Sequence, residues 1–155
     1  MHKREIVFVA LLAAFAVLAM GRVAGAQAAG GGKLRLELFV NDVAKSEQFY
    51  SEVLGFERVR NEGGYAVVRL GAVEFGLGTV GSLPPKHYFR PEIGKERKGL
   101  GTEIVIEVDD VDAAFERVKK TGHTILTPLG KRPWGLTDFR LADPDGYYLR
   151  ISSAS

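Results

Sequence analysis

The chain contains no cysteine, one tryptophan and two methionines among its 155 residues. Without cysteine there is no disulfide framework, no thiolate nucleophile and no thiolate ligand for a metal ion. Histidine is also scarce, because only His87 and His123 lie outside the first 28 residues. No site beyond that first segment can therefore use more than two imidazole groups.

The rest of the composition is that of a globular protein, with 46% hydrophobic and 26% charged residues. The length suits one domain with a core. The formal net charge of +2 depends on the first 28 residues, which hold Lys3, Arg4 and Arg22 against one acid, Glu5. Without them, 21 − 3 = 18 basic residues face 19 − 1 = 18 acidic ones. A neutral domain without a basic stripe argues against a nucleic-acid partner.

An unbroken apolar run, Ile6–Met20, follows a charged start and precedes small residues with A-x-A cleavage sites after Ala26 or Ala28. This order is typical of a secretory signal peptide. We expect residues 1–28 to be removed, residues 29–32 to form a flexible lead-in, and the mature protein to be secreted or periplasmic, with no stable membrane span. An N-terminal membrane anchor is the alternative, although the run is shorter than the roughly 20 residues of a comfortable span.

The pattern after this segment predicts one strand, one helix and three more strands. Residues 34–40 alternate strictly, which is the period of a half-buried strand, and Leu34 shares the apolar face with Val40. Asn41-Asp42 is suited to cap a helix and Gly55 to end it. The predicted elements are a strand at 34–40, a helix at 43–53 and strands at 56–60, 65–70 and 73–77, with a turn at 61–64.

The same order returns after residues 79–101, a segment rich in proline, glycine and basic residues. Long loops in compact domains are usually linkers or functional lids. The turn Asp143-Pro144-Asp145-Gly146 has the chemistry of a hairpin connection, and we expect its hairpin to form one wall of a binding site. The predicted elements are a strand at 102–108, a helix at 112–121, and strands at 123–127, 136–142 and 147–152.

The two halves align at a fixed offset, with Val40 on Val108, Asp42 on Asp110 and Val43 on Val111. Such a repeat predicts two structural copies packed as one domain. The sequence therefore favours an α+β domain over residues 33–155, with a first unit at 33–78 and a second at 102–152.

Three stretches carry a resemblance to a known family: Val40–Glu57, Val108–Gly122 and Pro133–Ile151. The chain resembles the vicinal oxygen chelate superfamily, which includes glyoxalase I, extradiol dioxygenases and bleomycin resistance proteins. The Pro-Trp-Gly corner and the following Asp-Pro-x-Gly turn are most similar to the bleomycin-resistance branch. The resemblance implies two βαβββ modules that form a curved mixed sheet around a cleft, and it implies a homodimer.

The resemblance also implies four positions at which family members hold a metal ion. These are Arg35 and Glu103 on the first strand of each module, Arg150 on the last strand, and Glu74 or Gly76 on the fourth. A guanidinium group has no acceptor and cannot bind a metal. Glu74 and Glu103 alone do not make a two-His-one-carboxylate site. We predict no metal cofactor, and a divalent metal on these two glutamates is the alternative.

Because the four family positions converge on one point, we expect the two arginines there to pair with the glutamates in place of the metal. A buried pair of this kind needs good geometry to offset its desolvation. The alternative is that Arg35 and Arg150 are solvated strand residues.

The sequence favours a binding protein for a small aromatic or amphipathic molecule over an enzyme. An enzyme would be a lyase or isomerase, or a metal-dependent glyoxalase- or dioxygenase-type protein, with Glu103 as general base and His87 assisting. A partner-binding domain without either activity is a third class. The candidate ligand-binding residues are Arg35, Phe39, Glu74, Tyr88, Glu103, Trp134 and Arg150, with Tyr65, His87, Phe89 and Tyr148 as further aromatic candidates.

Overall fold

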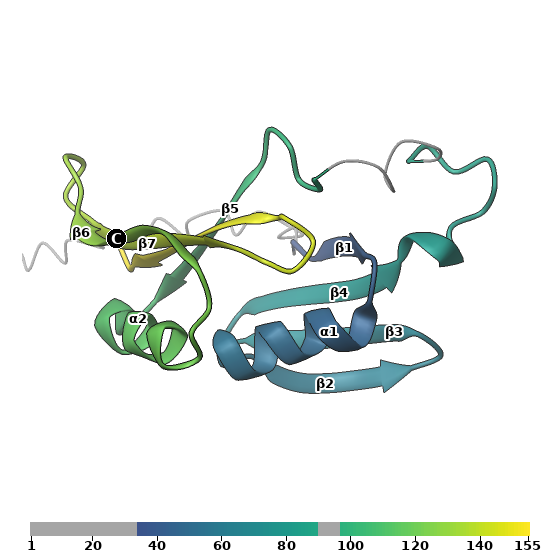
Figure 1. The fold of residues 1–155 in the computed structure, drawn as a ribbon, viewed down its shortest axis with the longest axis horizontal. Coiled ribbons are helices and arrows are strands. Elements are labelled where there is room, and N and C mark those ends of the chain that lie inside the picture. The colour runs from purple at the N-terminus through teal and green to yellow at the C-terminus, as the bar shows by residue number, and fades with distance from the viewer. Residues whose placement is uncertain (1–33, 90–96) are drawn as a thin grey trace, which may run out of the picture. The chain divides into compact units, whose positions relative to one another are not determined.

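Two mixed sheets of four strands, each with its own helix, make up the described residues, 34–89 and 97–155, of the computed structural model (Figure 1). The predictions for residues 1–28 and 29–32 lie outside the described residues. Within the described ranges, no helix combines the length and apolar character needed to cross a membrane.

The first module has the sheet order β1-β4-β3-β2, in which β1 and β4 are parallel and the other pairs antiparallel. It consists of β1 (Leu36–Val40), α1 (Val43–Gln48), η1 (Phe49–Val53), β2 (Glu57–Glu62), β3 (Tyr65–Leu70), β4 (Val73–Thr79) and η2 (Val80–Ser82).

The second module has the matching order β5-β8-β7-β6, with β5 and β8 parallel. It consists of β5 (Glu103–Val108), α2 (Val111–Lys120), β6 (Ile125–Lys131), β7 (Thr137–Ala142) and β8 (Tyr148–Ser153). The α+β fold with two βαβββ modules is thus confirmed, and its strands are divided between two sheets.

The repeat is visible in how each module turns from strand to helix. Val40 ends β1 and Val108 ends β5. Asp42 then accepts a hydrogen bond from the backbone N–H of Lys45 at 3.0 Å, and Asp110 accepts one from Ala113 at 2.8 Å. Both aspartates satisfy a helix N–H that has no partner inside the helix, as the sequence predicted.

One hydrophobic core contains residues from both modules. In β1 the side chains of Leu38 and Val40 enter this core, so those of Glu37 and Phe39 point to the opposite face of the strand. That outward face carries the site described below. The core consists of Leu38, Val40, Val43, Phe49, Tyr50, Leu54, Phe56, Ala66, Val68, Phe75, Leu77, Ile104, Ile106, Val111, Val118, Phe139, Leu141, Leu149 and Ile151.

Two predicted strands were wrong in their extent. Pairing of β1 with β4 begins at Leu36, and Leu34 is 78% exposed instead of joining the apolar face. The strand predicted at 123–127 is β6, Ile125–Lys131, which contains Pro128. Proline cannot donate to a ladder and is tolerated here because β6 is an edge strand with register shifts around that position.

Smaller differences concern the first module. Residues 61 and 62 belong to β2, because the turn is made by Gly63 and Gly64 alone, with φ of 60° and 81°. The helix predicted at 43–53 changes from α to π geometry at Phe49. Ser51 there donates to the carbonyl of Glu47 at 2.8 Å, a side-chain bond that competes with the helical pattern.

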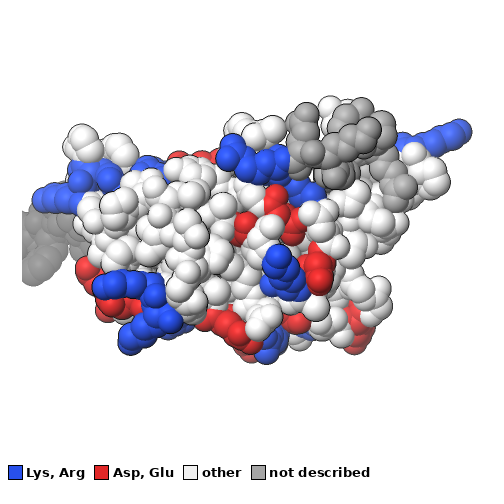
Figure 2. Space-filling model, in the orientation of Figure 1, with Lys and Arg blue, Asp and Glu red and all other residues white. Residues whose placement is uncertain are grey.

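The closing hairpin forms as predicted, with β7 and β8 antiparallel and Gly146 at a φ of 92° in their turn. On the face shown in Figure 2, basic and acidic side chains are interspersed, and no extended basic area is visible there.

Candidate functional site

A pocket of about 770 Å³ lies where the outward face of β1 meets the segment that joins the two modules. Its volume is in the range of small-molecule sites. β1 contributes two lining residues, the segment between β4 and β5 most of the others, and the residue just before β8 one. The lining residues are Glu37, Phe39, Tyr88, Phe89, Arg97, Lys98, Gly99, Leu100, Thr102 and Tyr147.

One wall of the pocket is aromatic. The ring of Phe39 lies 5.4 Å from that of Phe89 in an edge-to-face arrangement and 6.0 Å from that of His87. Tyr88 packs against Phe89 at 5.7 Å, yet it is 90% exposed. Aromatic pairs at these distances attract one another beyond simple burial. The wall therefore presents flat apolar surface with Tyr88 at its rim.

Glu37 contributes a carboxylate to the pocket, whose polar lining also includes Arg97, Lys98 and Thr102. This carboxylate accepts hydrogen bonds from the hydroxyl of Tyr65 at 2.9 and 3.0 Å and forms an ion pair with Arg35. Burial and then this hydrogen bond raise the pKa of Tyr65. A Cβ atom on Gly76 would collide with both the Tyr65 hydroxyl and the Glu37 carboxylate. Glu37 therefore occupies the space in which a side chain at residue 76 would stand.

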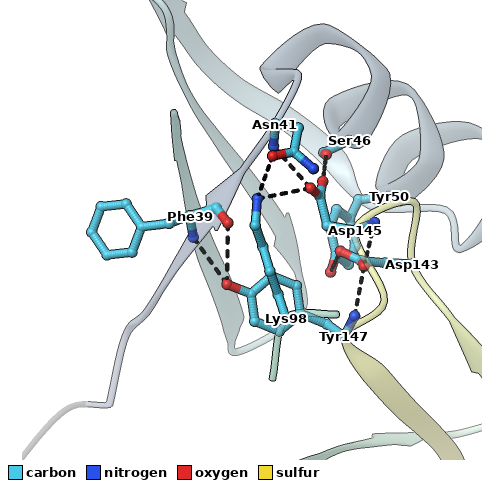
Figure 3. Close-up of polar contacts among 8 residues, drawn as sticks. All are labelled: Phe39, Asn41, Ser46, Tyr50, Lys98, Asp143, Asp145 and Tyr147. Atoms are coloured by element: carbon cyan, nitrogen blue, oxygen red, sulfur yellow. Dashed lines mark hydrogen bonds and ion pairs between the residues drawn. The ribbon is translucent and has the colours of Figure 1, made fainter. Parts of the chain in front are cut away.

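Lys98 fixes the joining segment to the rest of the domain (Figure 3). Its ammonium group donates to Asn41 Oδ1 and to Asp145 Oδ1, both at 2.9 Å. The same Asp145 carboxylate accepts from the backbone N–H of Asn41 at 2.9 Å and from the Ser46 hydroxyl at 3.3 Å. Three segments far apart in sequence thus meet at one buried carboxylate.

The turn that carries Asp145 is itself held from inside (Figure 3). Asp143 accepts from the N–H groups of Asp145 and Tyr147 at 2.9 Å and from the Tyr50 hydroxyl at 3.0 Å. Burial raises the pKa of the Asp143 carboxyl group. Burial and then the neighbouring Asp143 carboxylate raise the pKa of the Tyr50 hydroxyl. The turn is therefore a rigid support behind the pocket.

Tyr147 connects this support with the aromatic wall. Its hydroxyl accepts from the N–H of Phe39 and donates to the carbonyl of Phe39, both at 3.2 Å. Burial raises the pKa of Tyr147 to about 12. The closing hairpin thus contributes to the pocket through Tyr147, which is not among the ligand-binding residues predicted from the sequence.

A second group of charged residues lies on the sheet of the second module, on the face that carries Arg150. Arg140 donates to Glu103 at 3.1 Å, and Arg150 lies 3.6 Å from the other oxygen of Glu103. Asp138 is fully buried and pairs with Arg132 at 2.7 Å and with Arg140 at 3.2 Å. The guanidinium of Arg150 also lies 5.9 Å from the ring centre of Trp134.

The structure divides the predicted site residues between these two places. Phe39 and Tyr88 line the pocket, whereas Glu103, Trp134 and Arg150 belong to the charged sheet. The expected pairing of an arginine with a glutamate is present between Arg150 and Glu103. Arg35 and Glu74 do not pair with each other, since Arg35 pairs with Glu37, and Glu74 pairs with Arg69 at 2.8 Å.

The two histidines have different surroundings. His87 packs against the aromatic wall, 5.1 Å from the ring of Phe89. Its Nδ1 accepts from the N–H of Phe89 at 3.3 Å. The ring of His123 lies 4.9 Å from Phe49, and its Nε2 contacts the carbonyl of Ala142 at 2.8 Å. His87 is therefore next to the pocket, and His123 packs against core residues.

Strand pairing decides which residue of β4 corresponds to Arg150. Glu37 of β1 and Val105 of β5 occupy equivalent positions in the two modules, three residues before Val40 and Val108. Gly76 pairs with Glu37, and Arg150 pairs with Val105. The four family positions are thus Arg35, Gly76, Glu103 and Arg150, and only Glu103 offers a metal-binding atom. In the part of the chain that the structure describes, no three His, Cys, Asp or Glu residues are grouped to hold a metal ion. These residues do not fit a family metal site.

Comparison with known proteins gives the same family as the sequence motifs. The model of the Glyoxalase/Bleomycin resistance protein/Dioxygenase superfamily matches residues 33–151. The chain belongs to this superfamily.

The similar proteins include an enzyme, a resistance protein and a protein of unknown function, according to their names. A probable lactoylglutathione lyase of Vibrio parahaemolyticus is 32% identical over 126 residues, which cover 78% of this chain and 89% of that protein. A bleomycin resistance protein of Staphylococcus aureus is 32% identical over 113 residues, covering 68% and 84%. A crystal structure of a protein of unknown function from Agrobacterium tumefaciens superposes with a TM-score of 0.68 at 26% identity, covering 82% and 97%.

Proposed function

We propose that this domain binds a small amphipathic aromatic molecule, without a metal ion, in the pocket beside β1. The observation that supports this most is the wall formed by Phe39 and Phe89, with exposed Tyr88 beside it and the Glu37 carboxylate in the same lining. Flat apolar surface with a few fixed polar groups is the usual composition of a small-molecule site, and here Lys98 is fixed as well as Glu37.

The test uses N-phenyl-1-naphthylamine, whose fluorescence rises in apolar surroundings, titrated into the purified full chain. Phe39→Ala removes the centre of the wall and is expected to weaken binding at least tenfold. Tyr88→Ala changes an exposed rim residue, so it should weaken binding without affecting the fold. Leu126→Ala is the matched control, because this exposed side chain lies on β6 and does not line the pocket. Equal affinities for all four proteins would overturn the proposal.

A lyase or isomerase activity is the second candidate, favoured by the relatives that are named lactoylglutathione lyase. In this chain it would depend on Glu103 or Glu74 as base. Both carboxylates are engaged by arginines, Glu103 by Arg140 and Glu74 by Arg69. An assay of the full chain with lactoylglutathione, with and without added Ni²⁺ or Zn²⁺, decides between the two. Turnover that is lost in Glu103→Gln would favour the enzyme.

The prediction that the domain binds no metal ion is tested separately, by elemental analysis of the purified full chain. The proposal expects less than one tenth of an equivalent of any divalent transition metal after dialysis. A stoichiometric metal that Glu103→Gln removes would establish the alternative, a metal site on the carboxylates.

Two further parts of the proposal concern export and assembly. We expect residues 1–28 to be removed during export, which N-terminal sequencing of protein from the periplasm or medium will test. Retention of residues 1–28 in a membrane fraction would show an anchor instead. We expect a homodimer, and sedimentation equilibrium of the mature chain tests it by measuring the mass.

A further inference from the structure

A tight turn fixes the position of His87 beside the aromatic wall. The turn follows Leu83, whose side chain is buried. The N–H of His87 donates to the carbonyl of Pro84 at 2.9 Å, which closes a β-turn with Pro85 at its first central position. Proline fixes its own φ near the value that this position needs, so the turn has little conformational freedom. The imidazole ring of His87 therefore extends from a rigid support.

Phe89 is held to this turn by the imidazole ring. The N–H of Phe89 donates to His87 Nδ1 at 3.3 Å, and the two rings lie 5.1 Å apart. In the part of the chain that the structure describes, no second hydrogen bond holds the main chain of Phe89. The ring of Phe39 contacts both, at 6.0 Å from His87 and 5.4 Å from Phe89. The packing of Phe89 on Phe39 thus depends on an acceptor at His87.

This acceptor exists in one protonation state of the imidazole ring. Nδ1 accepts a hydrogen bond while the ring is neutral and carries its proton on Nε2. In the charged ring both nitrogens are donors, so Nδ1–H would point at the N–H of Phe89 and the bond would be replaced by repulsion. Histidine is the side chain that ordinarily changes charge between pH 5 and 8. A contact of this kind therefore belongs to neutral pH and is lost in mild acid.

The charged groups around the wall do not compensate for that loss. Glu37 on β1 is already engaged by Tyr65 and Arg35. The other charged or titratable side chains on the elements around the wall are Lys86, Tyr88, Arg97 and Lys98 of the joining segment and Tyr147 before β8. None of the described side chains forms a hydrogen bond or ion pair with the imidazole ring. Contact of a charged ring with Phe39 does not replace the acceptor that Phe89 loses.

We propose that His87 is a pH-dependent switch for the pocket beside β1. Neutral His87 holds Phe89 against Phe39, and the aromatic wall is complete. Protonation of His87 releases Phe89, so the wall loses a ring and the aromatic ligand binds more weakly. This inference rests on the function proposed for the pocket, and it adds that mild acid reverses the binding.

The experiment titrates the full chain with N-phenyl-1-naphthylamine at about pH 7.5 and at about pH 5.5, on either side of the ordinary titration of histidine. The probe itself stays uncharged over this range. We expect its dissociation constant to rise about fivefold at the lower pH, which corresponds to the loss of one neutral hydrogen bond. Circular dichroism at both pH values checks that the fold is intact.

Three variants assign the pH dependence to His87. His87→Asn keeps an acceptor that does not titrate, because an Asn Oδ1 can accept from the N–H two residues further on. Its dissociation constant should therefore be the same at both pH values. His87→Ala has no acceptor, so it should bind more weakly than His87→Asn and equally at both pH values. His123→Asn is the control and should keep the fivefold change, since His123 contacts Ala142 and does not line the pocket.

The switch has a second test that does not use the probe. A long-range ¹H–¹⁵N NMR spectrum of the imidazole groups at neutral pH should show the proton of His87 on Nε2, and a proton on Nδ1 would overturn the proposal. Equal affinities of the parent protein at the two pH values, or a fivefold change that persists in His87→Asn, would also overturn it. Failure of the probe to bind the parent protein at either pH would instead overturn the function proposed for the pocket, and the switch with it.

Discussion

The ammonium group of Lys98 lies 2.9 Å from the carboxylate Oδ1 of Asp145, and both side chains are only 3% exposed. This ion pair connects the segment between the modules to the turn of the closing hairpin (Figure 3). Lys98 also lines the pocket beside β1. One buried pair thus determines where a wall of the pocket lies.

Replacing Lys98 by Met is expected to lower the free energy of unfolding by about 3 kcal/mol, because it leaves Asp145 buried without its counter-charge. The same variant should weaken binding of the naphthylamine probe. Lys119→Met is the matched control, since Lys119 is 62% exposed in its pair with Glu116. Its effect should stay within about 0.5 kcal/mol. Urea unfolding of the parent protein and the two variants measures both stability changes, and a fluorescence titration measures the change in probe binding.

A double-mutant cycle shows whether the loss belongs to the pair. Lys98→Met combined with Asp145→Asn removes both charges, so the combined loss should be smaller than the sum of the two single losses. Simple additivity would show that Lys98 acts through its packing instead.

The close contact of Gly99 with Tyr147 leads to a second prediction. Gly99 and Gly101 have φ of 71° and 80°, so alanine at either position costs about 1 kcal/mol of backbone strain. A Cβ atom on Gly99 would also lie 2.7 Å from the ring of Tyr147, whereas one on Gly101 meets nothing within 4 Å. Thermal unfolding should therefore show Gly99→Ala less stable than Gly101→Ala. Equal stabilities would mean that the joining segment moves away from Tyr147 at little cost.

Local patterns in the sequence predicted the parts of the fold that depend on neighbouring residues. The caps Asp42 and Asp110 act within three residues of their partners, and the hairpin turn contains its own glycine. The family resemblance supplied the pairing of Arg150 with Glu103. The start of the first strand was misjudged because pairing with a neighbouring strand, and not the alternation alone, decides where a strand begins, and the pairing of β1 with β4 begins only at Leu36.

The parts that could not be predicted depend on contacts distant in sequence. Lys98 lies in a run of charged residues that is typical of a solvated loop, and its partners are 47 and 57 residues away. The alternation of residues 34–40 places Glu37 on the face opposite the apolar one, where a solvated side chain is the ordinary expectation, and only the absence of a side chain at Gly76 makes room for it. The alternation of Arg35 with Glu37 was the one available signal for that ion pair.

Two tyrosine hydroxyls that both donate to carboxylates allow a comparison of burial. Tyr50 is fully buried and donates to Asp143 at 3.0 Å, whereas Tyr65 donates to Glu37, whose side chain is 35% exposed. Tyr50→Phe should lower the free energy of unfolding by about 2 kcal/mol, since a buried charged acceptor loses its donor. Tyr65→Phe should change it by less than about 0.5 kcal/mol. Comparable losses in urea unfolding would contradict the role given to burial.

Tyr147 predicts how stability changes in alkali. Burial raises its pKa to about 12 in the folded protein, against about 10 for an unfolded tyrosine. The neutral phenol is therefore favoured by folding, and its contribution is complete below about pH 10 and disappears as the pH rises toward 12. Tyr147→Phe loses the hydrogen bonds to Phe39, so it should be less stable than the parent at pH 9. Because phenylalanine does not ionise, the difference between the two proteins should shrink steadily from pH 10 to pH 11.5 in urea unfolding. A constant difference over that range would show that the Tyr147 hydroxyl ionises at an ordinary pH and is not protected by the fold.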